Sequence, residues 1–442
     1  MKLLLKEGIF MVSKIKGTKD YSPSLANCKE VIKKQFYKQI KNFCFNIIET
    51  PIMEPVELYR RSVSESDIVK KEMYEFKDKG KRDIALRPEG TAGFIRALIE
   101  NKWYVPNDEI KSTKFAYFGP MFRYEQPQKG RLRQFYQAGV ETIMPKDQDL
   151  NPYQDAELII MAWNILKSLN IDFVLKINSI GDSNSRILYQ DNLKKYLQDY
   201  KNELTETSQE RLNNNVLRIL DDKIDSQKDF VKNAPKIDSF LSEKSKEYFD
   251  KLLYILDKNA IKYQKDSSLV RGLDYYDEVV YEFVSLSQNA GSQSTVIGGG
   301  RYSNLVKDLN GPDLYASGWG AGVDRLIDLM LDDKNHLFKD INNKIDVLIG
   351  ASNINNLDKL FSLCILLRNY IPNIEFISTP FKSKKLFEKA KKYNSTFLVC
   401  DDEKEGDNCF IIKNLLTNEK WIHKFSLLMD NKDEIITKFL KK

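Results

Sequence analysis

The chain has 442 residues, of which 42% are hydrophobic and 30% charged, a balance that is typical of a soluble globular protein. The 69 basic and 63 acidic residues leave a net charge of +6, which permits local nucleic-acid contacts but does not require them. This length predicts two or three domains, and no apolar run is long enough to cross a bilayer as a helix.

Cysteine and histidine usage narrows the chemistry further. The five cysteines are odd in number and form no CxxC pair, which argues against a zinc site or disulfide framework and predicts a reducing, cytoplasmic location. The two histidines, His336 and His423, lie in contexts unlike those of catalytic histidines, so we expect both at the surface. The apolar run Leu3–Leu5 is too short for a signal peptide, and Met11 is an alternative start.

The N-terminal part begins with a helix signal followed by an edge strand. Apolar residues at helical spacing predict a helix over 24–46, and residues 45–48 resemble a strand. Pro51 and Pro55 then confine the chain to an extended, edge-type conformation. A helix leading into an edge strand is either a dimer surface or an ordinary sheet edge, and the pattern does not decide between them.

Two further strands and a helix follow. The segments 73–77 and 82–87 are predicted to pair around the turn Lys-Gly-Lys. A proline ends the second strand, and Thr91 is placed to cap a helix over about 92–101. Glu89 lies in the loop between strand and helix, where it is either a ligand contact or a plain capping acid.

Residues 115–144 contain a basic hairpin. Aromatic residues lead in, and residues 134–143 show the rough polar/apolar alternation of a strand with one buried face. Three arginines and a lysine, opposed there only by Glu125, are Arg123, Lys129, Arg131 and Arg133. Guanidinium groups pair with phosphate or carboxylate through two parallel hydrogen bonds, so the hairpin is either a site for a polyanion or a solvated hairpin with surface charges.

The middle of the chain predicts a sheet domain interrupted by helices. An amphipathic helix and a buried strand ending at Gly181 precede residues 183–262, which are polar, helical and without a strand pattern. Strands return at 269–286, and the glycines at 298–300 allow the backbone to approach another segment or a ligand closely. Small residues then lead into a helix that carries Arg325.

The C-terminal part differs in rhythm. After a polar linker at 332–344, strands and helices alternate from Ile345 onward, which predicts a small α/β domain with a mixed, largely parallel sheet. Its helix at 382–392 carries six lysines against one glutamate. That helix has either a solvated face or a surface for nucleic-acid phosphates.

Together these segments resemble the class II aminoacyl-tRNA synthetases and, within them, the histidyl-tRNA synthetase family. The three class motifs match IIETPIMEPVELYRR, MFRYEQPQKGRLRQF and GWGAGVDRL. LVRGLDYY at 269–276 and GGGRY at 298–302 resemble strings specific to the histidine enzymes, and RPEGT, QKGR and NNNVLRILDDK also fit. The resemblance runs from KGTKDY at 16–21 to the C-terminal domain.

The resemblance implies an α+β fold, with an antiparallel catalytic sheet of six or seven strands, a helical insertion and a C-terminal α/β anticodon-binding domain. The implied catalytic domain has two parts, residues 12–182 and residues 263–333, with the helical insertion at 183–262 between them. The implied anticodon-binding domain spans residues 345–442. Motif 1 implies a homodimer.

The implied activity is that of an ATP-dependent histidine–tRNA ligase. L-histidine and ATP would give histidyl-adenylate and pyrophosphate, and the adenylate would then esterify the 3′ end of histidine tRNA. The resemblance implies ATP with Mg²⁺ as substrate, metal ligands that are not identified, and no tightly bound cofactor. The alternative is a non-catalytic, synthetase-like regulatory subunit of ATP phosphoribosyltransferase. Residues 345–442 and the arginines Arg123, Arg271 and Arg325 argue against it.

Site residues follow from the matched motifs. The resemblance implies catalytic roles for Arg271 and Arg123. It implies histidine binding by Glu89, Gly90, Thr91, Arg123, Gln137, Glu141, Arg271, Tyr275, Tyr276 and Tyr302. It implies ATP binding by Arg123, Glu125, Arg131, Phe135 and Arg325.

The motif 2 loop departs from the family pattern. Gln126, Leu132 and Tyr136 stand where the family usually has Arg, Tyr and His. This loop is expected to reach the acceptor end of the tRNA, so the departures affect the expected recognition of the first base and leave the adenylate contacts intact.

Overall fold

The computed structural model describes residues 12–62, 71–128, 130–146, 150–220, 222, 224–269, 275–287, 294–331, 345–401, 408–427 and 431–440. The chain divides into two compact units, Met1–Phe338 and Lys339–Lys442, each of which is considered by itself. The polar linker predicted at 332–344 lies outside the described residues.

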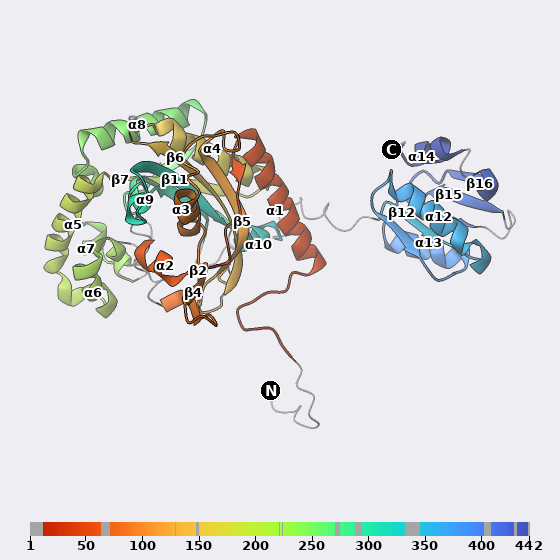
Figure 1. The fold of residues 1–442 in the computed structure, drawn as a ribbon, viewed down its shortest axis with the longest axis horizontal. Coiled ribbons are helices and arrows are strands. Elements are labelled where there is room, and N and C mark those ends of the chain that lie inside the picture. Colours follow the sequence, from red (N-terminus) through yellow and green to blue (C-terminus); the bar gives the residue numbers. More distant parts are fainter. Residues whose placement is uncertain are drawn as a thin grey trace, which may run out of the picture. The chain divides into compact units, whose positions relative to one another are not determined.

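An eight-stranded sheet forms the centre of the first unit (Figure 1). Its strands in spatial order are β1 (Asn46–Ile47), β5 (Lys114–Phe122), β6 (Gln134–Pro145), β11 (Leu314–Gly322), β10 (Thr295–Arg301), β9 (Asp277–Ser285), β7 (Phe173–Gly181) and β8 (Tyr263–Lys265). The inner pairs are antiparallel, whereas β1 with β5 and β7 with β8 are parallel. The antiparallel run from β5 to β7 has six strands, which agrees with the expected six or seven, and the parallel edge strands β1 and β8, of two and three residues, extend the sheet to eight.

Helices cover both faces of this sheet (Figure 1). One layer contains α1 (Pro23–Asn42), α4 (Pro152–Ser168), α8 (Glu243–Lys258) and α10 (Val323–Met330). The other contains α2 (Val56–Ser62), α3 (Thr91–Glu100) and α9 (Asn304–Asp308), which share an apolar core with β5 and β11. A small antiparallel sheet of β2 (Met53–Pro55), β4 (Asp83–Leu86) and β3 (Tyr74–Lys77) adjoins α2.

Helix α1 shows how local sequence sets the boundaries. Ser22 caps it by accepting a hydrogen bond from the Leu25 amide, and Cys28, Ile32 and Phe36 form part of its buried stripe. The predicted helix over 24–46 extends too far, because the chain leaves the helix after Asn42 and Cys44 adopts a φ of 59°.

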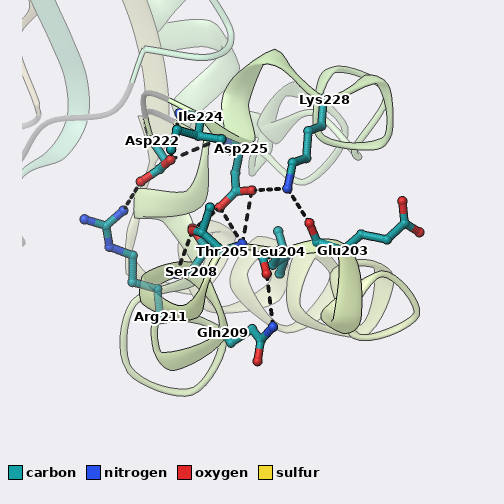
Figure 2. A network of polar contacts seen from close by, with 10 residues as sticks. All are labelled: Glu203, Leu204, Thr205, Ser208, Gln209, Arg211, Asp222, Ile224, Asp225 and Lys228. Carbon is teal, nitrogen blue, oxygen red and sulfur yellow. Dashed lines mark hydrogen bonds and ion pairs between the residues drawn. The ribbon is translucent and has the colours of Figure 1, made fainter.

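The helical segment between β7 and β8 carries the helices labelled α5 (Ser183–Gln198), α6 (Glu206–Asn214) and α7 (Asp229–Lys232) in Figure 1. It has an apolar cluster of its own, with Leu193 and Leu212 among its buried residues. It also has 3-10 turns at Lys201–Glu203, Val216–Ile219, Asp225–Gln227 and Ile237–Ser239. Helix α8, by contrast, packs on α4. A polar network around Asp225 joins α6 to the turns on either side of it (Figure 2).

The second unit has a five-stranded sheet in the order β13 (Ile374–Ile377), β12 (Val347–Gly350), β14 (Phe397–Asp401), β15 (Cys409–Asn414) and β16 (Lys420–Lys424). Its first two strand pairs are parallel and its last two are antiparallel. The prediction of a mixed sheet is therefore confirmed, but the prediction that most pairs are parallel is wrong.

Helices cover both faces of this second sheet. Helices α12 (Leu357–Arg368) and α14 (Lys432–Leu440) share one core, and α13 (Ser383–Lys392) packs into another. His336 lies outside the described residues. The expectation for His423 is wrong, because its ring is half-buried and stacks on Phe410 at 5.6 Å.

Candidate active site

Glu141 lies in the middle of β6 with only 1% of its surface exposed. Its Oε1 accepts hydrogen bonds from the Thr91 hydroxyl at 3.0 Å and from the Tyr117 hydroxyl at 3.2 Å, and its Oε2 accepts one from Tyr302. Burial raises the pKa of Glu141 to about 8, because it disfavours the charged form more than these hydroxyls favour it. The site therefore contains a buried acid whose protonated form is favoured by its surroundings.

Glycine makes room for this carboxyl group. Gly318 is the partner of Glu141 across the β6–β11 ladder, and a Cβ at that position would lie 1.8 Å from Oε2. Gly90 and Gly139 leave comparable room for the ring of Tyr117, which a Cβ would approach to 2.2 Å. A side chain at any of these positions would displace a group that contacts Glu141 or Glu141 itself.

Three tyrosines line one side of the Glu141 site. The rings of Tyr275 and Tyr276 are 4.9 Å apart, and those of Tyr275 and Tyr302 are 5.6 Å apart. All three side chains are buried. The structure thus brings together residues from two strings that are separate in the sequence, LVRGLDYY and GGGRY.

The loop before α3 forms another side of the site. Both carboxylate oxygens of Glu89 accept hydrogen bonds at 2.7 Å, from the amides of Thr91 and Ala92. Glu89 therefore caps α3, and the prediction that Thr91 caps this helix is wrong, since Thr91 is its first residue and donates its hydroxyl to Glu141. The side-chain oxygen of Gln137 accepts a hydrogen bond from the Gly90 amide at 3.2 Å.

A cluster of arginines adjoins this pocket. Arg123 donates from Nε to the carbonyl oxygen of Pro88 at 2.8 Å, and its guanidinium carbon lies 5.3 Å from the centre of the Phe135 ring. Arg131 lies 3.1 Å from Glu125, whose carboxylate is also 4.0 Å from Arg123. The cluster therefore starts at the loop that carries Glu89.

Arg325 completes the cluster from the first turn of α10. It donates to the carbonyl oxygen of Thr295 at 2.6 Å and to that of Gly130 at 3.3 Å. Burial lowers the pKa of Arg325, and the positive charges of Arg131 and Arg123 lower it further. Arginines that repel each other in this way form a favourable site for a polyanion, which would relieve the repulsion.

The hairpin cations do not all point to this cluster. The guanidinium of Arg133 stacks on the Tyr124 ring at 4.1 Å and donates to the carbonyl oxygen of Glu125 at 3.3 Å. Lys129 and Arg271 lie outside the described residues. The remaining predicted site residues gather around Glu141 or around Arg123.

Two residues that contact this site were not predicted from the sequence. Tyr117 donates to Glu141, and alternation along β5 would have placed it on a buried face but not against a carboxyl group. Asp324 accepts a hydrogen bond from the Tyr136 amide next to Phe135, and its only sequence signal is its position beside Arg325.

Comparisons with known proteins identify the family of this chain. The model of the histidyl-tRNA synthetase family matches residues 17–326. Histidine–tRNA ligases of Mycoplasmopsis pulmonis and Ureaplasma urealyticum are 44% and 43% identical to this chain, cover 92% of it, and are themselves covered to 94% and 96%.

Solved structures extend the comparison to the fold. Apo histidyl-tRNA synthetase from S. aureus has 31% identity and a TM-score of 0.77, with 95% of this chain and 99% of that chain covered. A structure from Bacillus halodurans C described as an ATP phosphoribosyltransferase regulatory subunit/histidyl-tRNA synthetase is 20% identical at a TM-score of 0.63, and shows the shared fold alone. With a family model over most of the sequence and relatives above 40% identity, this chain belongs to the histidyl-tRNA synthetase family.

Proposed function

We propose that this protein is a histidine–tRNA ligase that activates L-histidine with ATP and transfers it to the 3′ end of histidine tRNA. The observation that carries the proposal is that a pocket suited to a polar side chain and a cluster of cations suited to phosphates lie side by side in one domain. A buried, hydroxyl-lined carboxyl group, Glu141, adjoins a cluster of three arginines that begins at the Glu89 loop. Family membership supports the same conclusion.

The arginine cluster would bind the nucleotide. Attack by a histidine carboxylate oxygen on the α-phosphorus forms the acyl–phosphate bond and releases pyrophosphate, and it crowds several anions together. Such a reaction depends on positioning and cationic stabilisation rather than on a protein nucleophile. In this proposal Arg123 binds the α-phosphate and the substrate carboxylate, Arg131 and Arg325 bind the distal phosphates, and Arg271 adds positive charge at the α-phosphate.

Adenine recognition would involve the same hairpin. Phe135, whose ring lies beside Arg123, would stack on the base, and Glu125 would accept a hydrogen bond from the adenine amino group. Because Glu125 is ion-paired with Arg131, ATP binding would exchange that pair for contacts with phosphate and base.

The Glu141 pocket would select histidine. Both imidazole nitrogens need partners in a dry pocket, because an unpaired buried polar group costs about 1–3 kcal/mol. Glu141 and Tyr276 would contact the imidazole, with Tyr275 and Tyr302 beside them. Glu89, Gly90, Thr91 and Gln137 would surround the α-amino group and nearby substrate atoms.

Several features remain part of the proposal. Mg²⁺ would arrive bound to ATP, and residues 345–442 would bind the anticodon. Dimerisation through motif 1, a cytoplasmic location and the four domain segments are likewise proposed. Among the described residues, none of the helices combines the length and apolar character that crossing a membrane requires.

Histidine-dependent ATP–pyrophosphate exchange tests the proposal directly. We expect exchange with L-histidine and none above background with glycine, proline or threonine. If the purified, folded protein shows no exchange with histidine, the proposal that it is a histidine–tRNA ligase is contradicted. The non-catalytic regulatory subunit then becomes the favoured alternative. The relatives from Mycoplasmopsis and Ureaplasma are named ligases, which favours the first outcome.

A further inference from the structure

The N-terminal segment 14–21, which we call the strap, lies against the basic hairpin. The carbonyl oxygen of Gly17 accepts a hydrogen bond from the Arg133 amide at 2.7 Å. Gly17 has a φ of +89°, and a Cβ there would lie 2.8 Å from Arg133 Cγ and 2.9 Å from Pro127 Cγ. Glycine is therefore required for the strap to approach the hairpin this closely.

The strap ends at a buried carboxylate that joins three distant segments. Asp324, only 4% exposed, accepts a hydrogen bond from the Tyr21 hydroxyl at 2.6 Å through Oδ1. Its Oδ2 accepts one from the Tyr136 amide at 2.8 Å. Tyr21 and Asp324 are 303 positions apart, and Tyr136 and Asp324 are 188 apart. One carboxylate thus connects the strap, strand β6 and helix α10.

The position of Asp324 explains why a side chain makes this connection. The β6–β11 ladder ends with Gln137 paired to Gly322, after which β11 passes into α10. The Tyr136 amide lies one residue beyond that end, so it lacks a backbone acceptor from β11. Asp324 supplies the acceptor and thereby fixes the start of α10 relative to β6.

Other contacts support the same junction. The Lys29 ammonium lies between two rings, 4.6 Å from the centre of Tyr21 and 4.1 Å from that of Tyr136. These rings meet edge to face at 5.8 Å, and Lys19 pairs with Asp328 of α10 at 3.4 Å.

We propose that the strap positions the ATP-binding residues, with Tyr21 as a positioning residue that acts through Asp324. This inference rests on the proposed function. Tyr136 is the neighbour of Phe135, and Asp324 is the neighbour of Arg325, so the junction holds the groups proposed for adenine and for the distal phosphates. The histidine pocket depends on it less, because Thr91, Tyr117 and Tyr302 hold Glu141 from other elements.

Tyr21→Phe tests this inference, because it keeps the ring and removes the hydrogen bond to Asp324. We expect the KM for ATP in pyrophosphate exchange to rise about three- to tenfold, which is roughly the effect of losing one hydrogen bond that positions the ATP-binding groups. The KM for histidine should stay within about twofold. Gly17→Ala, which forces the strap away from Arg133, should shift the same parameter in the same direction.

Tyr263→Phe is the matched control. It removes another tyrosine–aspartate hydrogen bond, an exposed one of 3.2 Å between Tyr263 of β8 and Asp257 of α8, and should leave both KM values unchanged. An unchanged KM for ATP in Tyr21→Phe, or an equal rise in both KM values, would overturn the inference. Calorimetric titration with ATP applies the same test without turnover, so an unchanged Kd refutes the strap separately from any failure of histidine-dependent exchange.

Discussion

Two buried carboxyl groups, Glu141 in the central sheet and Asp225 in the helical segment, resemble each other in surroundings but differ in partners. They are 1% and 0% exposed, and each accepts a hydrogen bond from a threonine hydroxyl. Asp225 also has Lys228 at 2.7 Å (Figure 2). Burial raises the pKa of Asp225, but the contacts with Lys228 and Thr205 outweigh it and lower the pKa to about 2, whereas that of Glu141 is raised to about 8.

The presence or absence of an ion-pair partner distinguishes a structural carboxylate, Asp225, from one that is available to a ligand, Glu141. Asp225 forms an ion pair with Lys228 inside the protein. Removing the carboxylate would leave Lys228 without its counterion. Around Glu141, the described residues supply hydroxyl donors and no ion pair. An uncompensated buried acid destabilises a fold, so we infer that its position is retained for contact with the substrate imidazole.

The largest expected effect comes from Glu141→Gln. The substitution keeps the shape and an acceptor for the hydroxyls but removes the ionisable group proposed to face the imidazole. We expect histidine-dependent exchange, measured as kcat/KM for histidine, to fall by at least about 10²-fold, because a pocket built for a polar side chain loses its discrimination when pairing fails. Full activity in this variant would remove Glu141 from substrate recognition.

The stability of that same variant provides a second test. Since the folded pKa of Glu141 is raised, the native state holds a proton that the unfolded state releases between about pH 4.5 and pH 8. The wild-type free energy of unfolding should therefore decline across this range through Glu141 and level off above it. Glu141→Gln should lack that decline and be up to a few kcal/mol more stable than wild type at pH 8.5.

Urea unfolding of both proteins at pH 5 and pH 8.5 measures this difference. A stability gap that does not widen with pH would mean that Glu141 is not held protonated by burial.

Asp225→Asn should act in the opposite sense. We expect a loss of about 1–3 kcal/mol in the free energy of unfolding at pH 7, because the bond to Lys228 loses its charge and the lysine its counterion. Since the folded pKa is lowered, this stabilisation is present above about pH 3.8 and is lost as pH falls toward 2. The variant and wild type should therefore converge in acid.

The exchange rate provides the contrast with Glu141. Asp225→Asn should leave histidine-dependent exchange within about twofold of wild type at 25 °C, provided that the protein remains folded. A large loss of exchange would show that the helical segment influences the catalytic sheet through this network.

Exposed charges on α13 give the smallest expected effect. Lys384 and Lys391 are exposed. Alanine at both positions should leave thermal stability unchanged and weaken tRNA binding a few-fold. It should also reduce the slope of log K against log salt by about 0.7–0.9 for each phosphate that is no longer neutralised. Lys262→Ala, an exposed lysine of the first unit, is the control, and an unchanged slope would favour a purely solvated face for α13.

The sequence by itself predicted most of the elements and the family. The basic hairpin, the helical segment after Gly181 and the alternating C-terminal domain were expected, because periodicity records which face of an element is buried. Motif strings placed Glu141, Tyr302 and Arg325 in one site. The short edge strand β8 and the end of α1 were missed or misplaced, since they depend on one or two residues at an element boundary.

Only the tertiary structure decided which partner each polar group has. Glu89 was open to two interpretations, and its capping role became clear from two amides at 2.7 Å. Tyr302 reaches Glu141 across 161 positions, and Tyr21 reaches Asp324 across 303. Hydrophobic periodicity in a sequence reports relations between residues a few positions apart. The charge state of a buried acid depends instead on hydrogen-bond donors that folding brings from distant segments. That dependence is why Glu141 and Asp225, two buried carboxyl groups that each accept a hydrogen bond from a threonine, differ so widely in pKa.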